Sequence, residues 1–479
     1  MTTATIKVGR PGLPKQLKVG DLPAHIGGEG SIYFSTDDLF VVKIYHHPSP
    51  EKPKLLEHVL SLGTNLGADE QFLAWPLGIV SQLNGQPVVG VVTRRVSPDF
   101  VPLYKLVYSP IDAVAQFRQG RSWLEYVKMA RATAAAVRAI HGLGMAHADI
   151  HFKNFLAHPE TGEVVLIDLD GLVVTGFLPP QVKGMRGFIA PEVVQGKATP
   201  DETTDRHSLA VLILWILLLR NVMQPQVCYD PDDPNKDDEL GYGECACFSE
   251  HPNDRRNWLP KIGVPLYRKG ALSYRALPPK LQQLTERALI QGLYHPPTRP
   301  QAVEWERALA EAYDVLVPCL HCRQTFFYPY WLNPPPRRLC PFCGYGVQPP
   351  YPAVLDLLEP RSRGTYICVR TIAVYHGLPL FEDLAEPSRI PPFTRRDTPV
   401  IAQAEWEPKE GNYRLVNVGV TAWRILGGGS GAIAGGESVA LKRGLLLSLG
   451  DGKRVVRVIE PGTPWVPQQE ESNGSQRTP

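Results

Sequence analysis

Two carboxylates and one amide fall close together in the middle of the chain. Asp149 is followed five residues later by Asn154, and Asp168 ends the apolar run 164–167. One carboxylate can orient a substrate hydroxyl and accept its proton, while an amide and a second carboxylate can hold Mg²⁺ against phosphate groups. The spacing points to phosphoryl transfer, although a short Asp-x-x-x-x-Asn match also arises by chance.

A lysine inside an apolar strand adds a cation to this set. Residues 39–45 read Leu-Phe-Val-Val-Lys-Ile-Tyr, and an unpaired ammonium at Lys43 would be costly there. Its partner is a phosphate or a carboxylate. Glu57 is the expected carboxylate, because residues 51–62 have the apolar spacing of an amphipathic helix. The alternative places Glu57 on the solvated face of that helix.

Glycines precede this strand at Gly27, Gly28 and Gly30, just before the β-branched and aromatic run that contains Ile32. Without a Cβ, these positions would let the backbone close over phosphate groups. Taken alone, the stretch also fits an ordinary hairpin with a glycine turn.

Helical patterns lie on both sides of the stretch that contains Asp149, Asn154 and Asp168. Residues 121–142 predict a long amphipathic helix, and 209–219 form an eleven-residue apolar run. A bilayer span takes about 20 residues, so we expect that run to be a buried helix. Further helices are expected at 279–291 and 301–315, and residues 222–262, rich in Pro, Asp and Gly, are expected to form an insertion loop.

Length and composition limit the class of protein. A chain of 479 residues predicts two or three domains. Its hydrophobic content of 43% is that of a soluble globular protein, and its net charge of +2 argues against a nucleic-acid partner. The first residues lack the apolar core of a signal peptide. We therefore expect a cytoplasmic protein with neither nucleic acid nor membrane among its partners.

In their order, and over about residues 20–315, these motifs resemble the eukaryotic-type serine/threonine protein kinase family in a divergent bacterial form. The resemblance implies an α+β bilobal kinase fold over residues 21–316. It also implies ATP with Mg²⁺ or Mn²⁺ as cofactors, and transfer of the γ-phosphate to Ser or Thr of a partner protein.

The resemblance assigns a role to each residue of the nucleotide site. It makes Gly27, Gly28, Gly30 and Ile32 the loop and strand that cover the nucleotide. Lys43 would hold the α- and β-phosphates while paired to Glu57. Asp149 would be the catalytic carboxylate beside His151, and Asn154 and Asp168 would bind Mg²⁺.

Three further residues would support this site if the resemblance holds. Glu192, which follows Ala190-Pro191, would close the activation segment and pair with Arg299. Asp205 would brace the catalytic loop from the buried helix.

Four positions depart from the family pattern. His25 replaces the first loop glycine, and Ala148 replaces the arginine that docks a phosphorylated activation loop. His151 replaces a lysine beside the catalytic carboxylate, and Asp170 stands where the flexible glycine would be. The main interpretation is that the protein is an active kinase. A pseudokinase scaffold that binds nucleotide and recruits partners, and a small-molecule phosphotransferase, stay open as alternatives.

Two Cys-x-x-Cys pairs predict a metal site. Cys319 and Cys322 are separated by seventeen residues from Cys340 and Cys343, a spacing typical of a tetrahedral four-cysteine Zn²⁺ site. We expect a zinc ribbon over 317–348 in which a structural Zn²⁺ supplies the folding free energy. A chance or redox pairing is the alternative, and His321 is expected to be a bystander.

A second group in the insertion is weaker. It comprises Cys228, Cys245, Cys247 and His251. These residues could form another metal site, but free thiols are the favoured interpretation.

The last part of the chain predicts an all-β domain. After a Pro-rich linker at 349–362, residues 363–462 alternate apolar and polar positions in short runs, which is typical of a β-sandwich. Residues 441–450 resemble the last strands of a forkhead-associated domain in degenerate form, without the family's Gly-Arg and Ser-x-x-His pair. Residues 1–20 are expected to form a loose lead-in, and 463–479 a disordered tail.

Kinases of this makeup resemble those of tellurium-resistance-like phosphorylation systems. That resemblance suggests a von Willebrand A-type protein as substrate and docking partner, together with a cognate phosphatase.

Overall fold

The structure, a computed structural model, describes residues 2–108, 121–174, 184–258, 272–332, 338–362, 365–386, 398–426, 431–450 and 454–462. It divides into two compact units, Met1–Ala312 and Tyr313–Pro479. The tail expected to be disordered, 463–479, lies outside the described residues, as does the side chain of Asp170.

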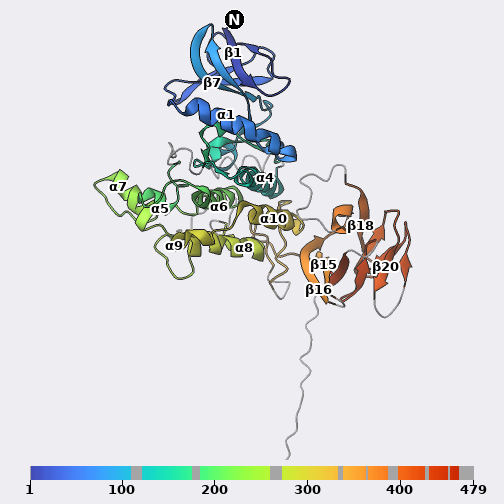
Figure 1. Ribbon diagram of the computed structural model, residues 1–479. Helices are drawn as coiled ribbons and strands as arrows, with labels where there is room; N and C mark the ends of the chain where they lie inside the picture. The colour runs from blue at the N-terminus through green and yellow to red at the C-terminus, as the bar shows by residue number, and fades with distance from the viewer. Residues whose placement is uncertain are drawn as a thin grey trace, which may run out of the picture. The chain divides into compact units, whose positions relative to one another are not determined.

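The first unit begins with a seven-stranded antiparallel sheet in the order β2-β1-β6-β7-β5-β4-β3 (Figure 1). Its strands are β1 (Thr2–Gly9), β2 (Gln16–Val19), β3 (His25–Ile26), β4 (Gly30–Phe34), β5 (Phe40–Tyr45), β6 (Pro76–Leu83) and β7 (Gln86–Arg94). A bridge from Val19 to Ser35 links β2 to the end of β4, so the sheet curls around an apolar core that includes Ala4, Val42 and Val92.

The prediction that residues 1–20 form a loose lead-in is wrong. In β1, Thr2, Ala4 and Ile6 alternate inward in the period of two that a half-buried strand requires. β1 pairs with β2 on one side and β6 on the other. The first strands are therefore part of the sheet that carries the glycine loop and Lys43.

Helix α1 (Lys52–Leu62) confirms the amphipathic helix expected at 51–62. Its buried Leu56 and Leu60 pack on Tyr45, Ile79 and Val91 of the sheet. Figure 1 shows α1 lying across one end of the blue strands, between them and the helical part of the unit.

The helical part confirms the other expected helices. The long helix is α4 (Trp123–Gly142), which starts at a capping box of Ser122 and Glu125. The apolar run lies in α6 (Glu202–Leu218), whose residues 207–218 are all buried. The remaining helices are α2 (Tyr104–Val107), α5 (Pro191–Val194), α7 (Pro234–Glu239), α8 (Pro279–Glu286), α9 (Gly292–Tyr294) and α10 (Ala302–Tyr313).

The first unit also contains short strands. They are β8 (Val101–Pro102), β9 (Met145–Ala146), β10 (Phe155–Ala157), β11 (Val164–Leu166) and β12 (Val173–Val174). β10 pairs with β11, and β9 pairs with β12. These pairings place the loops that hold Asp149 and Asp168 beside each other. Among the helices that the structure describes, none has the length and hydropathy needed to cross a membrane.

The second unit opens with the hairpin β13 (Leu316–Pro318) and β14 (Thr325–Phe327). Two antiparallel sheets follow, in the orders β16-β15-β24-β23-β20-β21 and β17-β18-β19-β22. Their strands are β15 (Ala353–Ser362), β16 (Thr365–Val374), β17 (Pro379–Phe381), β18 (Val400–Glu407), β19 (Asn412–Asn417), β20 (Trp423–Leu426), β21 (Ala432–Ile433), β22 (Ser438–Ala440), β23 (Leu446–Ser448) and β24 (Val455–Glu460).

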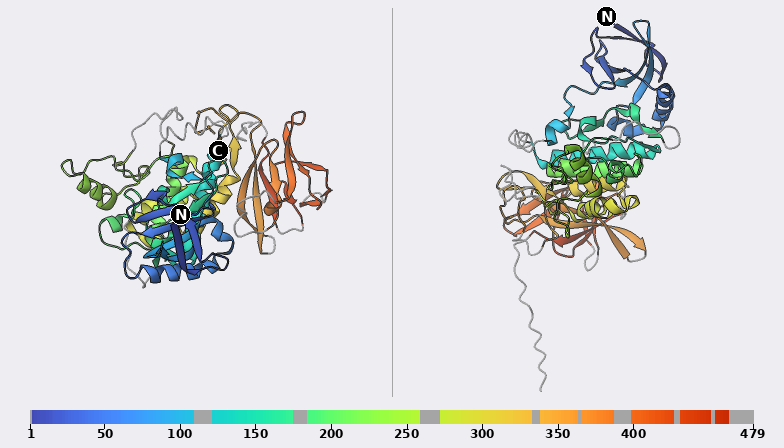
Figure 2. Two further views of the ribbon diagram at one scale, coloured as in Figure 1. Left: turned by 90° about the horizontal axis from the view of Figure 1, so that it is seen from above. Right: turned by 90° about the vertical axis from the view of Figure 1, so that its left-hand side faces the viewer.

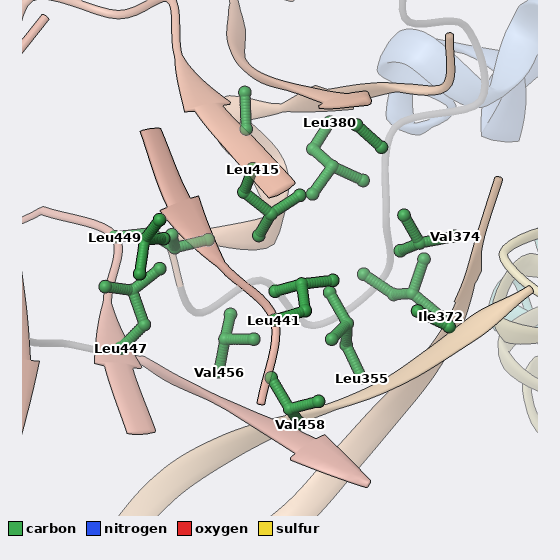
Figure 3. Packing of buried hydrophobic residues seen from close by; sticks show 14 of the residues in the cluster. Leu355, Ile372, Val374, Leu380, Leu415, Leu441, Leu447, Leu449, Val456 and Val458 are labelled. Carbon is green, nitrogen blue, oxygen red and sulfur yellow. The ribbon is translucent and has the colours of Figure 1, made fainter. Parts of the chain in front are cut away.

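The two sheets share one apolar core. Leu355 and Val456 from the first sheet face Leu380 and Leu415 from the second (Figure 3). The prediction of a linker at 349–362 is wrong for most of its length. β15 occupies Ala353–Ser362 as an inner strand between β16 and β24. The Pro-rich composition of 349–352 ends where this strand begins.

Candidate active site and metal centre

Asp205 holds the loop that carries Asp149. The residue is 1% exposed, and its carboxylate accepts the backbone N–H groups of His147 at 2.6 Å and Ala148 at 2.9 Å. The Nε2 atom of His141 lies 3.1 Å from the same carboxylate. Ala148 is thereby held at φ 66°, a conformation that few residues other than glycine adopt. The predicted brace is thus present in the structure.

Asp149 receives two hydrogen bonds on the same oxygen. Its Oδ2 lies 3.1 Å from His151 Nε2 and 3.1 Å from Asn154 Nδ2. His151 Nδ1 accepts the N–H of Lys153, so the neutral ring carries its proton on Nε2 and donates it to Asp149. Burial raises the pKa of the Asp149 carboxyl, but the hydrogen bonds from His151 and Asn154 and the electrostatic influence of His151 and His147 together outweigh burial and hold that pKa below its usual value.

A hairpin brings Asn154 and Asp168 together. Phe155 of β10 pairs with Leu166 of β11, and the N–H of Ile167 donates to the carbonyl of Asn154 at 2.8 Å. The two residues therefore flank the same end of the hairpin, although fourteen positions separate them. Among the described residues, the Asn154 side chain makes its two hydrogen bonds through Nδ2, so its amide oxygen could bind a cation.

Lys43 connects this cluster to the sheet. Its Nζ donates to Asp168 Oδ1 at 2.5 Å and to Glu29 Oε2 at 3.3 Å. The ion pair expected between Lys43 and Glu57 does not form in the described geometry: Glu57 is 46% exposed and pairs with Lys7 of β1 at 3.4 Å. Glu29, inside the glycine loop, is a partner that the sequence analysis missed.

The glycines of the loop differ in whether the structure around them requires glycine. A Cβ at Gly30 would lie 2.4 Å from the carbonyl oxygen of Ile44, so only glycine fits there. Gly27 donates its N–H to Gly30 O at 2.9 Å, whereas nothing lies within 4 Å of a Cβ at Gly28. Ile32 sits opposite Lys43 in the pairing of β4 with β5. The loop is thus a tight turn whose tip at Gly28 is open.

Glu192 and Arg299 form the expected pair. The guanidinium of Arg299 is buried and donates to both carboxylate oxygens of Glu192, at 2.6 and 2.9 Å. A two-pronged bond of this kind fixes orientation as well as distance. It joins α5 to the segment before α10.

Two buried histidines lie near these groups. Burial lowers the pKa of His207 well below its ordinary value, and the charge of Arg299 lowers it further. Burial also lowers the pKa of His147, although the charge of Asp205 partly offsets the effect. Both rings are therefore neutral in the folded protein at pH 7.

The four predicted metal-binding cysteines meet in the second unit. All four sulfur atoms lie within 4.8 Å of one another. Cys319 Sγ is 3.8 Å from Cys343 Sγ, and Cys322 Sγ is 3.8 Å from Cys340 Sγ. Four sulfurs bound at about 2.3 Å to one tetrahedral zinc lie about 3.8 Å apart, so the spacing fits Zn²⁺.

The two knuckles have the same backbone form. Arg323 and Gly344, each directly after a second cysteine, have φ of 63° and 70°. Burial raises the pKa of the Cys322 thiol to about 11 and raises that of Cys340 as well, and a metal cation among the sulfur atoms would favour their thiolate forms. The ring of His321 stacks on Tyr345 at 4.5 Å, which fits a bystander.

The cysteines of the insertion do not gather. Among the described residues, the four-cysteine group is the one cluster with metal-binding geometry. Cys247 Sγ instead contacts the carbonyl of Phe248, and His251 Nδ1 accepts backbone N–H groups from Asn253 and Asp254. The interpretation as free thiols fits this arrangement.

Comparison with known proteins finds similarity in one part of the first unit. The family model for the protein kinase domain matches residues 113–237. A dual serine/threonine and tyrosine protein kinase of Apis mellifera is 27% identical over 114 residues, which are 24% of this chain and 11% of that relative. Residues 113–237 are therefore similar to a protein kinase domain, and the match spans about a tenth of the length of the curated relative.

The family match covers only part of the predicted site. It includes Asp149, Asn154, Asp168 and Glu192, and it leaves out the sheet with the glycine loop and Lys43. The nucleotide-covering roles expected for Gly27, Gly28, Gly30, Ile32 and Lys43 therefore stay a prediction.

Proposed function

We propose that the chain is an ATP-dependent serine/threonine protein kinase. The observation that carries this proposal is the meeting of four residues from separate elements. Asn154 donates to Asp149, Asp168 lies at the end of the same hairpin, and Lys43 reaches across from the sheet to Asp168. Phosphoryl transfer needs positioning and charge neutralisation of this kind more than covalent chemistry.

Asp149 would act through its second oxygen. Within the described chain, both of its side-chain hydrogen bonds end on Oδ2, which leaves Oδ1 toward a substrate hydroxyl. That hydroxyl oxygen attacks the γ-phosphorus of ATP, its proton passes to Asp149, and the bond to the bridging oxygen breaks to release ADP. His151 and Asn154 keep the carboxylate oriented during this step.

The residues present suit a magnesium ion. Asn154 and Asp168 offer an amide oxygen and a carboxylate, the hard oxygen ligands that Mg²⁺ prefers. Mg²⁺ bound there would neutralise charge on the phosphate oxygens. Lys43 would exchange its present carboxylate partners for those oxygens.

The second unit would serve docking rather than catalysis. Four cysteines around a structural Zn²⁺ leave no open coordination position. We interpret the two sheets as a degenerate forkhead-associated-like module that binds a partner protein. A von Willebrand A-type protein, dephosphorylated by a cognate phosphatase, is the partner class that fits the sequence resemblance.

A nucleotide-binding pseudokinase scaffold is the second candidate function. One observation favours it: Glu57 pairs with Lys7, and Lys43 is held by Glu29 and Asp168. In an active kinase the lysine pairs with the helix glutamate. The first candidate therefore requires α1 to move Glu57 toward Lys43 when nucleotide binds.

Phosphate incorporation from labelled ATP, measured with Mg²⁺ and a candidate protein substrate, tests the two candidates. Asp149→Asn is expected to lower incorporation at least a hundredfold, while Asp99→Asn, an exposed aspartate outside the site, retains wild-type activity. Equal incorporation by both variants would refute the kinase assignment. Nucleotide binding without any incorporation would favour the scaffold.

A further inference from the structure

The segment 185–194 is fixed to the helical part of the first unit at two places. Ser208 Oγ donates to the carbonyl of Phe188 at 2.7 Å, and the Phe188 ring stacks on Trp215 with centroids 5.3 Å apart. Glu192 is held by Arg299. These contacts come from α6 and from the end of the unit, and they leave residues 185–187 to be held by something else.

Asn221, three residues after the end of α6, holds Gly187. Its Nδ2 donates to Gly187 O at 3.2 Å, and its Oδ1 accepts the N–H of Met223 at 2.8 Å. Asn221 is buried. Gly187 has φ 87°, and a Cβ there would lie 2.8 Å from Asn221 Nδ2, so the contact requires glycine.

Helix α7 and the turn after it hold the neighbouring residues. Arg186 donates to the carboxylate of Asp238 and to Asn235 Oδ1. Tyr242 lies beside Gly187, since a Cβ there would be 3.7 Å from its hydroxyl. Gly243 packs on α5, where a Cβ would meet Val194 at 3.2 Å. Figure 1 shows α7 beside α5 in the first unit, and Figure 2 shows the same green segments from two other sides.

We propose that residues 221–244 form a built-in clamp that holds segment 185–194 in the conformation that receives a protein substrate. Asn221 and Asp238 are its positioning residues, and the clamp takes the place of phosphorylation of this chain. The inference rests on the proposed kinase function, because the segment matters for substrate only if the domain transfers phosphate.

Two observations indicate that the conformation of segment 185–194 does not depend on phosphorylation of this chain. Ala148 offers no cation to a phosphate group, and the contacts at Arg186 and Gly187 use groups that are always present. Thr175 is the one hydroxyl-bearing residue between Asp168 and Glu192 in the sequence. A phosphorylation switch in this stretch would therefore depend on a single site.

Asn221 and Asp238 are expected to stabilise segment 185–194 to different degrees. The Arg186 side chain is largely exposed, so its ion pair is screened by solvent and weak. Asn221 satisfies a carbonyl in a buried place, and its loss would leave that carbonyl unpaired. We expect Asn221→Ala to raise KM for the protein substrate about tenfold, with KM for ATP unchanged. Asp238→Arg is expected to raise it about threefold.

The test combines kinetics with hydrogen exchange on the full chain, using dephosphorylated casein as the acceptor protein. Asn221→Ala and Asp238→Arg should speed amide exchange in residues 185–190, and the double variant Arg186→Asp with Asp238→Arg should restore slow exchange and KM. Thr175→Ala and phosphatase-treated wild type should keep their activity within about twofold.

Unchanged exchange in both single variants would overturn the clamp, as would activity that phosphatase treatment abolishes and incubation with ATP restores. Faster exchange in the variants, with no phosphate transfer even by wild type, would support the clamp and refute the proposed kinase function. The two failures are therefore distinguishable.

Discussion

Asp205→Asn removes one charge and one acceptor from the place where the catalytic loop is fixed. In the folded protein this buried carboxylate accepts two backbone N–H groups, from His147 and Ala148, and lies 3.1 Å from His141 Nε2. Asparagine keeps one acceptor oxygen and turns the other position into an NH₂ group. One backbone N–H then faces another donor instead of a carboxylate oxygen.

The size of the effect follows from these contacts. A hydrogen bond to a buried charged group is worth about 1.5–3 kcal/mol, and an unpaired buried donor costs about 1–3 kcal/mol. The variant should lose about 2–4 kcal/mol of stability in this loop. Holding Ala148 at φ 66° itself costs about 1–2 kcal/mol, so the weakened loop will relax and displace Asp149. A loss of this size corresponds to about a hundredfold lower kcat.

Thermal unfolding and phosphate incorporation measure the two consequences. Glu202→Gln is the matched control, because Glu202 lies on the same helix and near His141 but is 42% exposed. It should change stability by less than about 0.5 kcal/mol. If Asp205→Asn keeps wild-type stability and kcat, or if Glu202→Gln does equal damage, the account of the loop is wrong.

Three shorter predictions concern other sites. Cys340→Ser should lose bound zinc and destabilise the second unit, whereas Cys368→Ser, an exposed thiol, should keep the metal, as measured by metal analysis and thermal unfolding. His207 has a folded pKa well below its unfolded value of about 6.5; its neutral form stabilises the fold above pH 6.5, and this stability is lost as pH falls below that value. The difference in Tm between pH 7.5 and pH 5.5 should shrink in His207→Gln. Glu29→Gln frees Lys43 from a partly exposed partner and should tighten ATP binding about two- to fivefold by titration.

The catalytic cluster could be predicted because its residues are close in sequence. Asp149 and Asn154 share one loop, and Asp168 ends the strand that pairs back onto the residues after Asn154. Because few residues separate them, these side chains must lie near one another in the fold. Cys319 and Cys340 were also predictable, because each cysteine pair forms a local knuckle whose geometry depends on few residues.

The partner of Lys43 was not predictable in the same way. Glu57 sits on the expected helix, but the choice between Lys43 and Lys7 depends on where α1 lies against the sheet. Lys7 lies on β1, which the sequence analysis took for a loose lead-in. Its alternation is short, and its pairing with β6 spans more than seventy residues, so no local pattern reveals it.

A buried cation links the ribbon to the sheets in the described part of the second unit. Arg338, two residues before Cys340, is completely buried and donates to both carboxylate oxygens of Glu460 on β24, each at 2.7 Å. It also donates to the hydroxyl of Tyr328 and the carbonyl of Leu332.

Breaking such a buried pair costs about 3–5 kcal/mol, because the remaining charge stays unpaired. Loss of the metal would free the knuckle that holds Arg338 in place, and Glu460 would then lose its partner within the sheet. Zinc removal should therefore unfold ribbon and sheets in one transition of the second unit. Arg338→Met should lower the temperature of that transition while leaving bound zinc at one per chain, and two separate transitions after chelation would contradict the coupling.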